Sequence, residues 1–168
     1  YWKKYKPMTN KAPFWYSDEK LPKLDILKKN GMNCAGLVWI LRRYVGLPIV
    51  RNSKKIGYGD SDTWVKYLRK KKRLKKFNIN KSYPAGTLLI RDFNLEDHGH
   101  VAVIFKENKK GVLFSSLLHS VGWNDGSGNR GVKIDDSVGK SHFAQYNGTT
   151  NKGHYTHICL PEDWLIKE

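Results

Sequence analysis

The segment from Asn33 to Gly46 constrains the fold of this chain more than any other. Its interior, Cys34–Val45, is apolar on nearly every side, which is typical of a helix buried at the centre of a domain. Asn33 is a favourable N-terminal cap and Gly46 a favourable C-terminal stop. Arg42 and Arg43 lie in the last turn, where the helix dipole favours cations. We therefore predict one buried helix against which the rest of the chain packs.

Strand-like patterns fill much of the second half of the chain. After Pro84-Ala85-Gly86 the apolar residues come in short runs rich in β-branched and aromatic side chains, which favours strands. The predicted strands are 87–91, 101–105, 112–114 and 155–160. Asn108-Lys109-Lys110-Gly111 is a hairpin signal. An antiparallel sheet is the expected arrangement.

Further helices are expected in the first half. A short helix is predicted over 21–30, where leucine and isoleucine recur among lysines. Another should begin near Asp60 or Ser61 and carry Trp64 and Leu68 on one face. Together with the strands, these helices indicate an α+β fold with helices first and the sheet after them.

The length of 168 residues suits one domain with a sizeable core, so we assign 1–168 to a single unit. Within it, residues 1–20 are expected to be extended and residues 122–153 to form a long loop rich in Gly, Asn and Ser. No apolar run approaches the roughly 20 residues that a membrane-spanning helix needs. The sequence therefore predicts no transmembrane segment.

The chain is strongly basic. It has 31 Lys and Arg against 15 Asp and Glu, a net charge of +16. Such a charge attracts polyanions, whether anionic wall polymers, nucleic acid or acidic membranes. The densest part is the run Lys66–Lys76, for which a solvated helix face is the simpler interpretation and docking to an anionic polymer the functional one.

The two cysteines differ in context. Cys159 lies in a short apolar run that is typical of a buried strand, so its thiol is expected to be an inert core group. Cys34 directly follows the predicted cap Asn33, and a helix N-terminus lowers the pKa of a thiol. The two could pair, but two cysteines are far from a disulfide framework. Cys34 is the candidate nucleophile.

A thiol nucleophile needs an imidazole, and the candidates are His98 and His100 at the start of a predicted strand. Both project to one face, so His98 is either an alternative base or a residue near the cleft. A hairpin centred between Lys109 and Lys110 would place His119 directly opposite His100. His119 is then the candidate to orient the imidazole.

Four motifs carry a family resemblance. Asn33-Cys34-Ala35-Gly36-Leu37-Val38 resembles the helix start of the NlpC-type cell-wall cysteine peptidases, which are related to the CHAP amidases. Gly46-Leu47-Pro48, Pro84-Ala85-Gly86-Thr87-Leu88-Leu89 and His100-Val101-Ala102-Val103-Ile104 resemble later motifs of the same family. They span roughly residues 31–120 and occur in the family's order.

The resemblance implies a minimal papain-like fold, with the cysteine helix packed on an antiparallel sheet. It implies Cys34 as nucleophile, His100 as base and His119 as the orienting residue, acting on γ-D-glutamyl amide bonds of peptidoglycan stem peptides. Tyr16 is the candidate for the tyrosine that binds substrate or the oxyanion in that family. It lies 18 residues before the cysteine, whereas the family's tyrosine lies about a dozen residues before it. The aromatic residues that could line a substrate groove are Trp15, Tyr16, Trp64 and Trp123, although ordinary packing is the simpler interpretation for most of them.

Other functions remain open from the sequence. The same core and nucleophile serve thioesterases, acyltransferases and deamidases. A non-catalytic, basic structural or binding module, such as a virion component, is an alternative of a different class. Cys34, His98, His100 and His119 are also zinc-ligand types, but their spacing is not that of a zinc site. We expect no metal and no cofactor, and a secreted, wall-associated or virion-packaged protein.

Overall fold

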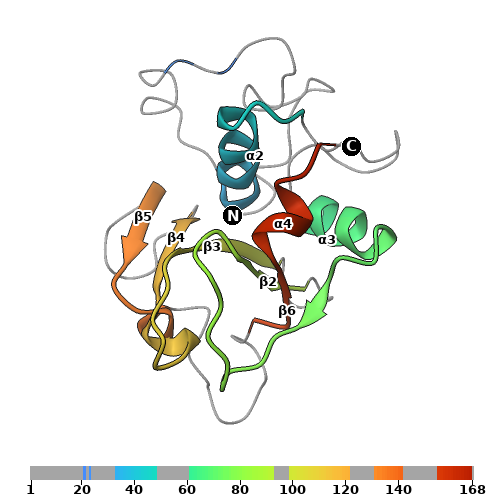
Figure 1. The fold of residues 1–168 in the computed structure, drawn as a ribbon. Coiled ribbons are helices and arrows are strands. Elements are labelled where there is room, and N and C mark those ends of the chain that lie inside the picture. Colours follow the sequence, from blue (N-terminus) through green and yellow to red (C-terminus); the bar gives the residue numbers. More distant parts are fainter. Residues whose placement is uncertain are drawn as a thin grey trace.

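A computed structural model describes residues 21, 23, 33–48, 61–92, 99–121, 131–141 and 155–167. These residues combine helices with an antiparallel sheet, as predicted (Figure 1). The helices are α2 (Cys34–Tyr44), α3 (Ser61–Lys70) and α4 (Pro161–Trp164), with 3₁₀ turns η2 (Val112–Phe114) and η3 (Val138–Lys140). The strands are β1 (Lys75–Lys76), β2 (Leu88–Arg91), β3 (His100–Lys106), β4 (Ser116–Val121), β5 (Gly131–Asp135) and β6 (His157–Cys159). No helix among the described residues is both long and apolar enough to cross a bilayer.

Local signals set both ends of α2. The Asn33 side chain accepts a hydrogen bond from the Gly36 N–H at 2.7 Å, which satisfies one of the unpaired donors of the first turn. Gly46 has φ +78°, a conformation that favours glycine. Its N–H donates to the Arg43 carbonyl, and the next N–H donates to the Arg42 carbonyl. This is a Schellman motif, so the predicted start and stop of the helix are confirmed.

The sheet has the order β1-β6-β2-β3-β4-β5 and separates two cores. Because strand side chains alternate, Leu88 and Ile90 enter one core and Leu89 the other. The helix-side core holds Ala35, Val38, Trp39, Trp64, Val65, Tyr67, Leu68, Leu88, Ile90, Val101, Val103, Cys159 and Trp164. The loop-side core holds Tyr83, Leu89, Ala102, Ile104, Val112, Leu117, Val138, Tyr155 and Ile158. Burial on both faces explains why these strands are apolar throughout rather than alternating.

Aromatic packing joins the helices over the sheet. The Trp64 ring lies 4.6 Å from Trp39 and 6.0 Å from Trp164, measured between centroids. Trp64 and Leu68 are fully buried, as the predicted inward face of α3 required. The suggestion that Trp64 could line a substrate groove is therefore wrong, because its ring is fully buried in the helix-side core.

Arg42 is a buried cation that ties α2 to the end of the described chain. Its guanidinium donates to the backbone carbonyls of Pro48, Trp164 and Ile166. A planar guanidinium has several donors in fixed directions, so one side chain can satisfy acceptors from two segments far apart in sequence. Arg42 thus fixes α4 against α2.

Two predictions about strands are wrong. Residues 112–114 form η2 rather than a strand, and the partner of β3 is β4, which begins at Ser116. The turn is closed by the Asn108 N–H, which donates to the Ser115 hydroxyl at 3.0 Å. The predicted loop 122–153 contains β5 and η3. The apolar run at 112–114 packs its first residue, Val112, into the core as part of a turn, so apolar content alone did not fix where strand pairing begins.

The register of the hairpin also differs from the prediction. Val103 pairs with Leu118 and Ile104 with Leu117, so His119 is displaced by two positions from the residue opposite His100. The wider connection through η2 moves the centre of the hairpin by one residue. A shift of two preserves the alternation, so His100 and His119 still share a face.

Candidate functional site

The two histidines predicted to work together are in contact. His100 is the first residue of β3 and His119 lies in β4. His100 Nε2 is 3.1 Å from His119 Nδ1, and the rings meet edge to face with centroids 5.3 Å apart. Both side chains are almost completely buried. The hydrogen bond joins the diagonal neighbours of the hairpin rather than a directly opposed pair.

Asp135 extends this pair into a row of three. Its Oδ2 lies 2.9 Å from His119 Nε2, and its Oδ1 lies 3.5 Å from Lys133 Nζ. β5 pairs with β4, which brings the carboxylate beside His119. Sequence reasoning missed Asp135 because it lies within the predicted loop. The alternation of Val132 and Ile134 with two charged residues was the signal for a strand there.

Tyr155 is a buried phenol next to the same row. Its ring centroid is 6.4 Å from that of His100. Burial raises the pKa of Tyr155 well above its ordinary value; the Ser141 hydroxyl lowers it, and negative charge at Asp135 and at Cys34 raises it again. The phenol therefore stays protonated, and it lies within electrostatic range of both Asp135 and Cys34. Nothing in the sequence marked this tyrosine as a site residue.

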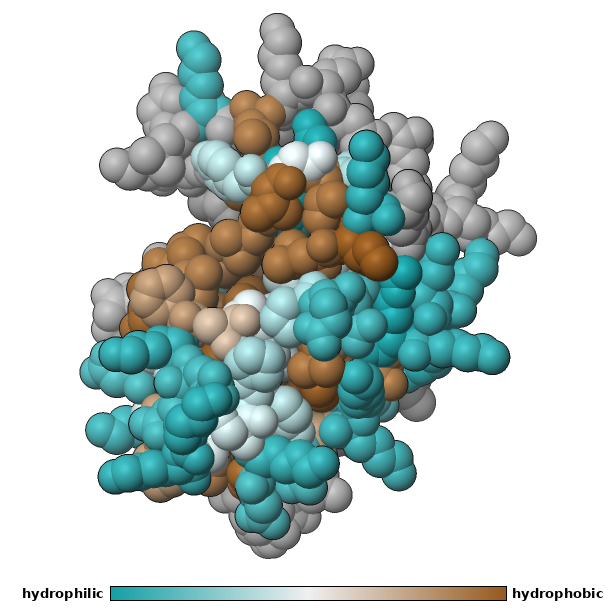
Figure 2. Space-filling model, viewed as in Figure 1, coloured by the Kyte–Doolittle hydropathy of each residue, from teal (hydrophilic) through white to brown (hydrophobic). Residues whose placement is uncertain are grey.

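Cys34 is the first residue of α2 and is half-buried. It packs against the helix-side core, whereas His100 and His119 project from the loop-side face of the sheet. In Figure 1 the N-terminal end of α2 is directed at the sheet, and α2 contacts β3 and β4. Figure 2 shows apolar side chains gathered between α2 and the sheet. Tyr155, whose ring lies beside that of His100, is also within electrostatic range of Cys34, so it lies between the helix start and the imidazole pair.

Arg91 adds a cation to the neighbourhood. It is the cross-strand partner of His100, so the two side chains share a face of the sheet. Burial lowers the pKa of the Arg91 guanidinium and the nearby Tyr155 opposes that shift, which places Arg91 within electrostatic range of that phenol. An arginine remains charged in any protein environment, so the site includes a fixed positive charge.

Cys159 differs from Cys34 in the way the sequence predicted. It lies in β6 and is fully buried in the helix-side core. Burial raises the pKa of its thiol to about 12. Both cysteines are free thiols, so they do not pair. Only Cys34 combines a helix N-terminus with partial exposure.

The remaining predicted site residues, Trp15, Tyr16, His98 and Trp123, lie outside the described residues, as does most of the predicted helix 21–30. In the part of the chain that the structure describes, no group of three or more His, Cys, Asp or Glu side chains is arranged to hold a metal ion. Among known proteins, no family model and no curated sequence matches this chain.

Proposed function

We propose that this chain is a papain-like cysteine hydrolase that cleaves amide bonds through a thioacyl intermediate on Cys34. The observation that carries the proposal is the hydrogen-bonded row His100–His119–Asp135, together with Tyr155, which lies beside His100 and within electrostatic range of Cys34 at the start of α2. A thiol at a helix N-terminus and an oriented imidazole are the two groups that nucleophilic thiol catalysis needs.

The row fixes where the protons lie. The Asp135 carboxylate can only accept, so His119 Nε2 carries the hydrogen of that bond. In neutral His119 the other nitrogen, Nδ1, is then an acceptor, so His100 Nε2–H donates to it. Neutral His100 is left with an unprotonated Nδ1. Asp135 and His119 therefore act as positioning residues that leave His100 one nitrogen able to take a proton.

The proposed reaction is acyl transfer. His100 Nδ1 takes the proton of Cys34, and the thiolate attacks the amide carbonyl. The Cys34 N–H, at the positive end of α2, supports the developing oxyanion. The C–N bond breaks as the imidazolium of His100 returns its proton to the leaving amine. Water, deprotonated by His100, then hydrolyses the thioester and releases the acid.

The substrate class rests on the resemblance to the NlpC-type peptidases. We propose peptidoglycan stem peptides, cut at γ-D-glutamyl bonds, as the substrates. Arg91 supports this, since a fixed cation beside His100 suits a substrate rich in carboxylates. A thioesterase or acyltransferase would use the same groups with a different acyl donor, so substrate screening must include esters and thioesters.

Alkylation of the native protein tests the nucleophile without knowledge of the substrate. Iodoacetamide labelling is followed across pH, and both cysteines are mapped by mass spectrometry. We expect fast labelling of Cys34 well below the ordinary thiol range of about pH 8.5. His100→Ala should slow it. Cys159 is the internal control and should stay unlabelled, because it is buried and has a pKa of about 12.

Turnover provides the second test. Cys34→Ala should abolish cleavage of a stem peptide while leaving the thermal unfolding transition in place. Full activity in Cys34→Ala would show the assignment to be wrong. Slow labelling of Cys34 with the pH dependence of an ordinary thiol, unchanged in His100→Ala, would instead favour a non-catalytic binding module on the same fold.

A further inference from the structure

Residues 66–81 form a strongly basic segment. It contains nine Lys and Arg and no Asp or Glu. The basic residues are Lys66, Arg69, Lys70, Lys71, Lys72, Arg73, Lys75, Lys76 and Lys81. Among the described residues, Arg69 pairs with Asp92 at 2.6 Å and Lys75 approaches Asp163 at 3.6 Å. Figure 2 shows the hydrophilic side chains that surround α3 and β1.

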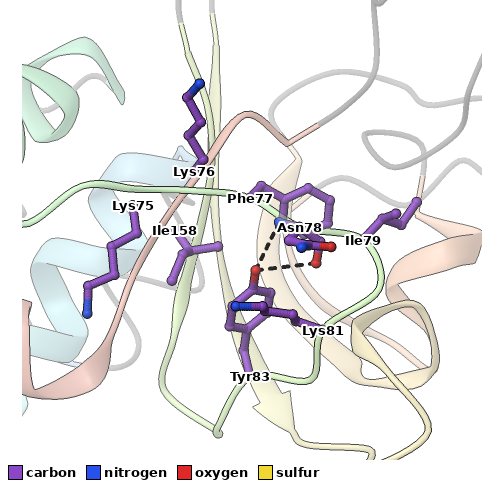
Figure 3. Close-up of a pocket in the computed structure, with 8 residues that line it drawn as sticks. All are labelled: Lys75, Lys76, Phe77, Asn78, Ile79, Lys81, Tyr83 and Ile158. Atoms are coloured by element: carbon purple, nitrogen blue, oxygen red, sulfur yellow. Dashed lines mark hydrogen bonds between the residues drawn. The ribbon is translucent and has the colours of Figure 1, made fainter.

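A pocket of about 540 Å³ opens at the end of this segment, at the β1 edge of the sheet. Its lining residues are Lys75, Lys76, Phe77, Asn78, Ile79, Lys81, Tyr83 and Ile158. The floor is apolar and aromatic, while the rim is formed by lysines and one amide (Figure 3). Neither Cys34 nor His100 lines it, so it does not contain the proposed nucleophile or base.

The pocket is preformed. The Asn78 N–H donates to the Tyr83 hydroxyl at 2.9 Å, and that hydroxyl donates to the Asn78 carbonyl at 3.3 Å. Phe77 is held by its N–H, which donates to the Thr156 carbonyl, and by ring contacts at 6.2 Å with Tyr83 and with Tyr155. A rigid wall loses little conformational entropy when a ligand binds.

The arrangement of the lysines selects the kind of anion. Figure 3 shows Lys75 and Lys76 pointing away from each other and Lys81 lying along Tyr83. Cations that do not converge on one point suit charges repeated along a polymer better than a small anion. The concave floor, with half-buried Phe77 and partly exposed Ile79, suits a flat apolar group rather than a membrane surface.

We propose that this pocket accepts a base of a single-stranded nucleic acid, while the lysines of residues 66–81 hold the flanking phosphates. A single strand is a polyanion whose bases are exposed, and base stacking on aromatic side chains beside a basic groove is its usual mode of recognition. A duplex keeps its bases stacked inside. A wall polymer of polyol phosphates has no flat apolar group to occupy the floor.

Fluorescence anisotropy with labelled oligodeoxythymidylate of roughly 12 nucleotides tests the proposal, with an abasic strand of the same length as comparison. We expect the abasic strand to bind about 10-fold more weakly, since stacking is lost. Ile79→Ala should weaken binding of the thymidylate strand but not of the abasic strand. Cys34→Ala should bind like wild type, so failure here is separate from failure of the proposed hydrolase.

Salt dependence tests the lysines. Lys76→Gln/Lys81→Gln should reduce the slope of log K against log salt by about 1.4, because two phosphate contacts are lost. Lys106→Gln/Lys140→Gln is the matched control: both lysines are exposed and outside the pocket, and the slope should hardly change. Equal affinity for both strands with equal effects of the two lysine pairs would overturn the proposal in favour of general charge attraction. Binding to phosphatidylserine vesicles in place of thymidylate would overturn it in favour of a membrane.

Discussion

Replacing Asp135 by Asn tests the role of the negative charge at the end of the histidine row, because it removes that charge and keeps the shape of the side chain. The amide oxygen can still accept from His119 Nε2–H, so the contact at 2.9 Å can persist without its charge. A hydrogen bond to a charged acceptor contributes roughly 1.5–3 kcal/mol and a neutral one roughly 0.5–1.5 kcal/mol. The midpoints of these ranges differ by roughly 1.3 kcal/mol, which corresponds to a nearly tenfold loss of preference for the productive tautomers.

Two measurements detect this loss of tautomer preference. The rate constant for iodoacetamide labelling of Cys34 at about pH 7 should fall about tenfold in Asp135→Asn. The nitrogen chemical shifts of ¹⁵N-labelled histidine should show protonated Nε2 and unprotonated Nδ1 at His119 in the wild type, and a mixture in the variant. The second measurement reports protons directly, so a general loss of stability would not imitate it.

Lys133→Met provides the matched control. Lys133 lies 3.5 Å from Asp135 Oδ1, on the oxygen that does not face His119. Removing this lysine should leave both the labelling rate and the His119 tautomer near the wild-type result. If Asp135→Asn and Lys133→Met behave alike in both measurements, the carboxylate does not set the tautomers and the reasoning is refuted.

Three further predictions concern stability. Asn33→Ala should lower the free energy of unfolding by about 1 kcal/mol through loss of the helix cap, while Asn33→Ser should keep most of it, as measured by urea unfolding. Gly46→Ala should cost about 1–2 kcal/mol, because a Cβ there meets no atom within 4 Å and only the positive φ opposes it; Gly46→Asn should cost less, and equal losses would contradict this. The pKa of Cys159 is raised from 9.0 to about 12, so the folded protein holds that proton more tightly. Its contribution to stability is complete below about pH 9 and is lost as pH rises toward 12; Cys159→Ala should flatten the fall in unfolding free energy above about pH 9, and an unchanged slope would contradict it.

Much of the fold could be predicted because it depends on neighbours in sequence. The cap at Asn33, the glycine at position 46 and the apolar faces of α2 and α3 act within one or two helical turns. The apolar runs that became β2, β3 and β6 carry their strand preference locally. β5 was missed because its flanking residues are typical of loops, and its pairing with β4 is a long-range property.

The candidate site was likewise predictable only in the parts that depend on neighbouring residues. The sequence alone determined a thiol at a helix start and two histidines on one face, because helix capping and strand alternation are properties of adjacent residues. Only the tertiary structure decided which histidine nitrogens meet, and that Asp135, Tyr155 and Arg91 join them. Those contacts depend on the register of four paired strands, β2 to β5, and on the segment around Tyr155, which lies far away in sequence. Such partners are set by packing and hydrogen bonds across long separations, for which no local pattern exists.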